Sequence, residues 1–337
     1  MKSALFSGGI ILLALGSAVA QKDSSVTHSP QPPEITFHSS SNLVLVPVIA
    51  LKNGLPDKTL KRDDFRVFDN GRPVSIKTFD SGAQFSTRPL ALWFVVQCNM
   101  QGWEKEGSGL FAGQLHLFKP ALKDLDNQDS VAVAHWCDDG ESSLDLLPTK
   151  AVNQAVNTME QVLTPMPYPE HHGRTGELAL QKTLQLIVDE THSMAPEPVP
   201  VLIFLYGDYS GMPKPEANHF IDELLETSAI AFGLRDRRSP NIGRLWGEQR
   251  AVANYIATET GGEYLWVTPD TYATGLQEIL QQLHFRYELG FKPATLDGKR
   301  HKLRVDLTDA AKIQHAGLRL RFRLAYVPAP SPAGESK

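Results

Sequence analysis

Short apolar runs, separated by segments with helical spacing, are the feature that most constrains the fold of this chain. Ala91–Val96 is a run of six apolar residues, and similar runs occupy Val131–Trp136, Val201–Tyr206 and Ala229–Leu234. Apolar runs of this length are typical of strands that are buried on both faces of a parallel sheet. The chain therefore contains the strands of a buried, mostly parallel sheet.

The segments between these runs carry apolar residues at helical spacing. A stripe at i, i+4, i+7 and i+8 lies within 180–188, one at i, i+3, i+4 and i+7 lies within 276–283, and another stripe spans 111–125. Pro120 is expected to kink or split that last helix, and Gly261-Gly262 to end a helix before it. Strands that alternate with helices over about 200 residues predict a doubly wound α/β domain with helices on both faces of the sheet.

A β pattern precedes the α/β segment. Leu43–Leu51 is apolar, and Pro47 within it favours an edge position or a bulge. Asn70-Gly71 stands between two alternating segments, which is a strong signal for a tight hairpin because both turn residues need positive φ.

A second β pattern follows the α/β segment, with strands expected at Tyr287–Phe291, Leu303–Leu307 and Leu318–Leu324. The last strand alternates apolar residues with arginines, and a solvated arginine face is the default expectation. Isolated hairpins are only marginally stable in water, so the two β segments are expected to pair into one small all-β, sandwich-like domain. The α/β domain would then be inserted between its two halves.

The N-terminus has the pattern of an export signal. Lys2 precedes an apolar core at Ile10–Leu15, and Ala18-Val19-Ala20 is a small-x-small cleavage site before Gln21. A membrane anchor is the alternative, but a spanning helix needs about 20 apolar residues. We expect a protein that is periplasmic or secreted, without a membrane span after the signal is removed.

These patterns predict six segments along the chain. They are a signal peptide (1–20), a disordered leader (21–40), the first part of the β-sandwich (41–85), the α/β domain (86–285), the second part of the β-sandwich (286–327) and a disordered tail (328–337).

Three motifs carry a resemblance to a known family. They are Asp63–Gly71, Thr260–Tyr264 and Tyr287–Pro293. On these motifs the chain resembles the VWFA-related proteins of Acidobacteria, over about residues 40 to 327. The resemblance implies a von Willebrand factor type A-like α/β domain, with a metal-ion-dependent adhesion site at the carboxyl ends of its strands.

The residues of that site are only partly kept. An Asp-x-Ser-x-Ser motif is expected after the first strand of the domain, but Gln97, Asn99 and Gln101 stand there. Thr175 matches the Thr of the second loop, and Asp208 stands near the Asp of the third. Mg²⁺ prefers hard oxygen ligands with carboxylates to balance its charge. We therefore expect a degenerate site and no cofactor, with residual Mg²⁺ binding as the alternative.

Cys98 and Cys137 are the two cysteines of the chain. The strands that they follow are neighbours in the fold that the resemblance implies, which would place the two residues within disulfide reach. Export makes a disulfide chemically allowed, and two separate buried thiols are the alternative.

Another metal cluster could be drawn from His135, Asp138 and Asp139 with His171-His172. Adjacent residues on a strand point to opposite faces, and paired histidines in a proline-rich loop are usually solvated. Solvated side chains are therefore the default interpretation of these residues.

Composition and motifs narrow the function. Net charge is −5 and no basic stripe occurs, which argues against nucleic acid. No Gly-x-Ser-x-Gly elbow or phosphate-binding loop is present, so we expect no enzyme. The sequence predicts a metal-independent protein-binding or scaffold module that uses loops at Gln97–Trp103, His171–Thr175 and Gly207–Met212. Trp103, Tyr209 and Met212 are the expected partner contacts. A Mg²⁺-dependent adhesin and, less well supported, a hydrolase are the alternatives.

Overall fold

The computed structural model describes residues 43–81, 88–97, 118–137, 139–162, 174–194, 198–205, 212–236, 252–268 and 271–328. All of them belong to one compact unit, Asn42–Lys337. The expected signal peptide, leader and tail lie outside the described residues. Within these ranges, no helix is both long and apolar enough to cross a lipid bilayer.

The largest sheet has six strands in the order β11-β10-β9-β6-β7-β8. The strands are β6 (Leu90–Gln97), β7 (Ser130–Trp136), β8 (Ser142–Thr149), β9 (Val199–Leu205), β10 (Ile230–Asp236) and β11 (Tyr264–Val267). All neighbouring pairs are parallel except β7 and β8, which are antiparallel. The four predicted apolar runs form β6, β7, β9 and β10, at the centre of this sheet.

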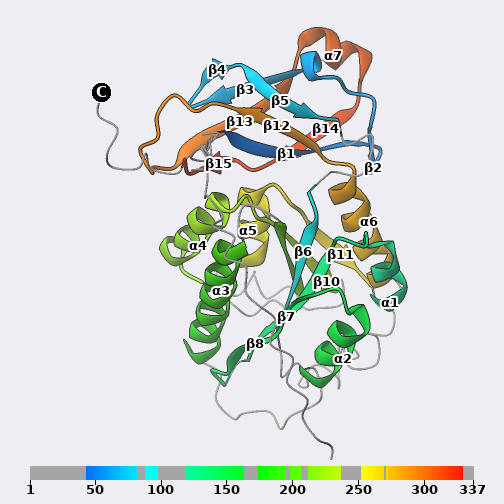
Figure 1. The fold of residues 1–337 in the computed structure, drawn as a ribbon, viewed down its shortest axis with the longest axis vertical. Helices are drawn as coiled ribbons and strands as arrows, with labels where there is room; N and C mark the ends of the chain where they lie inside the picture. Colours follow the sequence, from blue (N-terminus) through cyan, green and yellow to red (C-terminus); the bar gives the residue numbers. More distant parts are fainter. Residues whose placement is uncertain are drawn as a thin grey trace, which may run out of the picture. The chain divides into compact units, whose positions relative to one another are not determined.

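Helices cover both faces of the six-stranded sheet (Figure 1). One face carries α1 (Phe118–Ala121), α2 (Val152–Val162) and α6 (Tyr272–His284), and the other carries α3 (Arg174–Met194), α4 (Lys214–Glu226) and α5 (Val252–Thr260). Side chains of β6 alternate between the two layers, as strand geometry requires. The doubly wound, mostly parallel α/β prediction is thus confirmed. The sequence did not predict β8, α2, α4 and β11.

Two smaller sheets combine strands from both sides of the α/β segment. One has the order β14-β1-β12-β5, with β2 paired to β1, and the other has the order β15-β13-β3-β4. The strands are β1 (Val44–Lys52), β2 (Leu55–Pro56), β3 (Phe65–Asp69), β4 (Arg72–Val74), β5 (Ile76–Asp80), β12 (Tyr287–Phe291), β13 (His301–Leu307), β14 (Leu318–Phe322) and β15 (Ala325–Tyr326). Both sheets contribute to one hydrophobic cluster, which includes Val48, Val67 and Val305. A short helix, α7 (Asp309–Gln314), follows β13.

Local signals in the small sheets behave as their chemistry requires. Asn70 and Gly71 have φ of 48° and 81° and join β3 to β4, which confirms the predicted hairpin. Pro47 lies in β1, a strand inside its sheet, and pairs with Glu288 of β12. Pairing of β1 with β14 begins only at Val48, so Pro47 stands where β1 has one neighbour and loses no bond to β14.

The arginine face of β14 corrects a sequence prediction. Arg319 is exposed, but Arg321 forms an ion pair with Glu263, the residue just before β11. Arg323 is 2% exposed and donates hydrogen bonds to the carbonyls of Leu225 and Leu45. The expectation of a solvated face is therefore wrong beyond Arg319, because this end of the strand packs against the α/β segment. Burial lowers the pKa of Arg323 to about 10.

Candidate functional site

The strands at the centre of the large sheet end side by side. Gln97 of β6 is in register with Trp136 of β7, and Val96 with Leu205 of β9. Because these strands are parallel, their carboxyl ends form one edge, which we call the carboxyl edge. Open α/β sheets bind ligands at such an edge.

The structure describes two members of the predicted degenerate metal site. Gln97 is the last residue of β6 and is 1% exposed. Thr175 is the second residue of α3, as the sequence predicted, although its side chain is outside the described part. Asn99, Gln101 and Asp208 also lie outside the described residues. The degenerate metal site therefore stays a prediction, and so does its alternative, residual Mg²⁺ binding.

The three predicted partner contacts have different outcomes. Met212 is 6% exposed and belongs to the hydrophobic cluster that holds Phe220 and Ile221 of α4. Its prediction as a surface contact was wrong, because the residue just before α4 joins the apolar face of that helix. Trp103 and Tyr209 lie outside the described residues and stay predictions.

A tight turn at the carboxyl edge joins β7 to β8. The amide of Cys137 donates to the carbonyl of Glu141 over 2.8 Å, and the amide of Gly140 donates to the carbonyl of Cys137 over 3.1 Å. Gly140 has a φ of 104°, which suits glycine. The turn sets Glu141 opposite Cys137, and His135 opposite Ser143. Residues two apart on a strand share a face, so His135, Cys137 and Glu141 come together.

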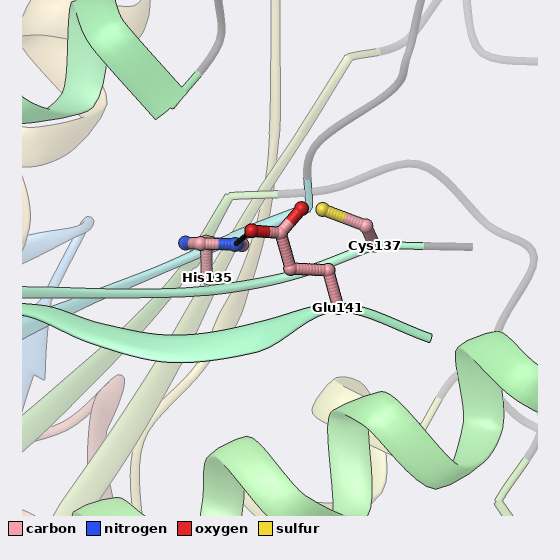
Figure 2. Close-up of side chains that lie close together, drawn as sticks. All are labelled: His135, Cys137 and Glu141. Carbon is pink, nitrogen blue, oxygen red and sulfur yellow. Dashed lines mark ion pairs between the residues drawn. The ribbon is translucent and has the colours of Figure 1, made fainter. Parts of the chain in front are cut away.

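Ligand atoms of His135, Cys137 and Glu141 all lie within 4.8 Å of one another. Figure 2 shows the Glu141 carboxylate between the His135 ring and the Cys137 sulfur in this view. His135 and Cys137 are buried, whereas the side chain of Glu141 is 54% exposed. The cluster therefore has two buried members and one solvent-facing carboxylate.

Asp145 of β8 holds the ring of His135. Its carboxylate oxygens lie 2.9 and 2.8 Å from Nδ1 of His135. Val133 pairs with Leu146 and Ala134 with Leu144, so Asp145 is the extra residue of a β-bulge. Bulges re-aim side chains, which explains how an edge strand directs this carboxylate to the ring.

The charges around His135 favour its cationic form. Burial lowers the pKa of His135, but the hydrogen bond and charge of Asp145, with Glu141 and Asp139, outweigh burial and raise the pKa. An ionised carboxylate only accepts hydrogen bonds, so Nδ1 carries a proton toward Asp145. Nε2 then lies 3.9 Å from a Glu141 oxygen, along the dashed line of Figure 2.

This arrangement differs from the metal cluster considered from sequence. Of its members, His135 and Asp139 are described, and Asp138, His171 and His172 lie outside the described residues. The partners of His135 include Asp145 and Glu141, which the sequence reasoning missed. A signal existed, since His135 and Cys137 are two apart on a strand and Asp139-Gly140 marks a hairpin turn.

The predicted disulfide has one described cysteine. Cys137 directly follows Trp136, whose register partner is Gln97, and Cys98 follows Gln97 in the sequence. Cys98 lies outside the described residues, so its pairing with Cys137 stays a prediction.

Comparisons with known proteins show likeness only to solved structures, since no family model and no curated protein matches the chain. It is similar to a von Willebrand factor type A protein from Catenulispora acidiphila, at 11% identity over 86% of this chain and 75% of that one, with a TM-score of 0.42. The conserved hypothetical protein BatB from Bacteroides thetaiotaomicron is 15% identical over 58% of this chain and 97% of its own, with a TM-score of 0.38.

A third similar structure is the vWF domain of the type V pili tip protein Mfa5 from Porphyromonas gingivalis. It is 10% identical over 59% of this chain and 96% of its own, with a TM-score of 0.39. Likeness of this strength carries no argument about function. The fold of the present chain is defined by its own strand order and helix layers.

Proposed function

We propose that this chain is an exported, non-enzymatic protein-binding or scaffold module whose contact surface is the carboxyl edge of the six-stranded sheet. In this proposal the α/β segment is a von Willebrand type A-like domain inserted into a β-sandwich, which the two small sheets form. The inserted domain presents loops, and the sandwich gives it a fixed base.

One observation carries the choice of edge. The opposite, amino end of the sheet is occupied by contacts with the small sheets. Arg88, just before β6, forms an ion pair over 2.8 Å with Glu288 of β12, and both side chains are buried to about nine-tenths. Arg286 is 1% exposed and donates to the carbonyls of Leu283 and Arg88. A large partner therefore has the carboxyl edge, not the amino edge, available to it.

The same edge favours contacts with protein over chemistry. Loops held by buried strands are the usual place for recognition residues. Within the loops named above, Trp103 and Tyr209 remain the proposed contacts, while buried Met212 is withdrawn. Amide side chains replace the acidic ligand at Gln97 and the hydroxyls at Asn99 and Gln101, and amides bring no charge to balance a divalent cation. We therefore propose partner binding that needs no Mg²⁺.

Site-specific photo-crosslinking in cells that produce the full chain tests this proposal. A photoreactive residue is placed at Trp103 or Tyr209 and, as a control, at Ile313 of α7, which is 82% exposed. We expect discrete crosslinked products from the first two positions, unchanged by a chelator, and none from Ile313. Products from Ile313 alone would contradict the choice of edge. Products that vanish with chelator would favour the Mg²⁺-dependent adhesin.

A further inference from the structure

A sulfur, an imidazole nitrogen and a carboxylate converge at the β7–β8 turn, on residues that are not members of the degenerate adhesion site. The ligand atoms of His135, Cys137 and Glu141 lie within 4.8 Å of one another. A tetrahedral zinc centre with such ligands keeps them about 3.3–3.8 Å apart, given its bond lengths. Closure needs a shift of about 1 Å. Glu141 is half-exposed and is the side chain most able to make it.

The orientation of His135 is already that of a metal ligand. Asp145 fixes Nδ1 over 2.8 Å, which leaves Nε2 directed at Glu141. Zinc-bound histidines commonly donate their second ring nitrogen to a carboxylate, which fixes the tautomer and raises the basicity of the ligand. The bulge thus turns Asp145 toward the ring, where it supports His135. If His135, Cys137 and Glu141 lay close together only by chance, no such supporting residue would be needed.

The mixture of donors selects the cation. Thiolate, imidazole and carboxylate together suit Zn²⁺, whereas Mg²⁺ prefers oxygen ligands alone. Thiolate and carboxylate also balance the two positive charges. We propose that His135, Cys137 and Glu141 form a Zn²⁺ site, with Asp145 as its positioning residue and water at the fourth position.

The sulfur of Cys137 cannot bind zinc while it is part of a disulfide, so the site belongs to the reduced protein. A dithiol reductant donates two electrons to the predicted Cys98–Cys137 bond, which breaks to give two thiols as the reductant becomes a disulfide. The Cys137 thiol then releases its proton to solvent as the zinc–sulfur bond forms. This inference goes beyond the proposed function and does not depend on a protein partner.

Calorimetric titration of the purified protein with Zn²⁺ tests the site and its redox condition. We expect one Zn²⁺ per chain after reduction with a phosphine, and none in untreated protein. Cys98→Ser removes the predicted partner of Cys137, so this variant should bind one Zn²⁺ without reductant. Equal binding by untreated protein would overturn the redox condition. Absence of binding in Cys98→Ser, with binding by reduced wild type, would move the site to Cys98.

Variants of the ligands test the geometry. His135→Gln and Cys137→Ser should each weaken Zn²⁺ binding at least 100-fold, and Asp145→Asn about 10- to 100-fold, because it loses the support of the ring. His219→Gln is the matched control, since exposed His219 lies 3.5 Å from Glu223 in a surface pair. It should leave binding unchanged. Equal weakening by His219→Gln, or tight binding by Cys137→Ser, would refute the proposal.

A second readout covers variants that fail to fold. In Cys98→Ser, bound Zn²⁺ should slow alkylation of the single remaining thiol, and Mg²⁺ should not. If alkylation proceeds at the same rate with and without Zn²⁺, Cys137 is not a ligand and the proposal fails.

Discussion

Each end of the six-stranded sheet holds a pair of histidine and aspartate, buried at one end and partly buried at the other, and the two pairs are built differently. At the amino end, Nε2 of His284 lies 2.9 Å from Asp129. At the carboxyl edge, Nδ1 of His135 lies 2.8 Å from Asp145. The first pair joins α6 to the loop before β7, and the second joins β7 to β8.

The difference lies in what surrounds each carboxylate. Asp129 also accepts hydrogen bonds from the amides of Leu90 and Asp126, so both of its oxygens are engaged by backbone. Asp145 comes from a bulge on an edge strand, and the ring that it holds faces another acid, Glu141. The same two residue types therefore fasten chain segments at one end and orient a coordinating nitrogen at the other.

The largest expected effect is the loss of the Asp129 charge. Asp129→Asn should cost about 3–5 kcal/mol, because it breaks a buried pair and turns an amide donor toward N–H groups. Asp145→Asn should cost about 1–2 kcal/mol, since its side chain is 15% exposed and the bond that it loses is a single one. Urea denaturation with chelator present measures both. Equal losses would show that the two pairs have the same role.

Glycine at the junction with the small sheets should be the next most sensitive. Gly261 ends α5 with a φ of 88°, and a Cβ there would lie 2.5 Å from the backbone of Phe322 and Arg323. Gly71 has a similar φ of 81° but open space around it. Gly71→Ala should cost about 1–2 kcal/mol from its φ alone. Gly261→Ala should cost about 1–3 kcal/mol more because of crowding. Thermal unfolding of both variants gives the difference, and equal melting points would argue against tight packing at this junction.

The pH dependence of stability should reflect the carboxyl group of Asp129, the aspartate at the amino end of the sheet. Burial raises the pKa of Asp129, but hydrogen bonds from His284, Leu90 and Asp126 outweigh burial and hold the pKa below 3.8. A carboxyl with a depressed pKa stabilises the fold above its unfolded pKa, and this stabilisation is lost as pH falls through the folded pKa.

Urea unfolding of wild type and Asp129→Asn from pH 7 to pH 2 checks this expectation. The gap in unfolding free energy should stay constant down to about pH 4 and narrow below it. If the difference in unfolding free energy between the two proteins disappears near neutral pH, a group other than Asp129 is its cause.

The smallest expected effect is that of Mg²⁺ on the carboxyl edge. We expect no change in melting temperature with millimolar Mg²⁺, in wild type and in Asp208→Ala alike. A cation present at one hundred times its dissociation constant would add about 2.7 kcal/mol. A rise in wild type that Asp208→Ala abolishes would restore the residual adhesion site.

The sequence predicted the elements whose signal is local. Apolar runs gave the central strands of the large sheet, and β12 matches its predicted span, Tyr287–Phe291, at both ends. The β8 strand was missed because Ser142–Thr149 is an edge strand of mixed polarity that contains Pro148. The α4 helix was missed although its buried face, which includes Phe220 and Leu224, has helical spacing.

Predictions that depend on tertiary packing were the ones that failed. Met212 and Arg323 were expected near solvent from their residue type, yet Met212 is buried in the cluster that covers α4, and Arg323 is buried against Leu45, far away in the chain. The site at the β7–β8 turn needed Asp145, and only the register of the hairpin and its bulge reveal that residue. The alternation of side chains along one strand does not show which residue of the partner strand forms a bulge.

The pairing of β1 has a consequence for synthesis of the protein. Val48 stands opposite Tyr287, roughly 240 residues later in the chain. At about 5–20 residues per second, a ribosome needs about 12–48 s to deliver that partner. During this interval the apolar strand Val44–Lys52 has no β12 or β14 to pair with, and unpaired strands are prone to associate with other chains. A chaperone that shields β1 until translation ends would therefore raise the yield of native protein.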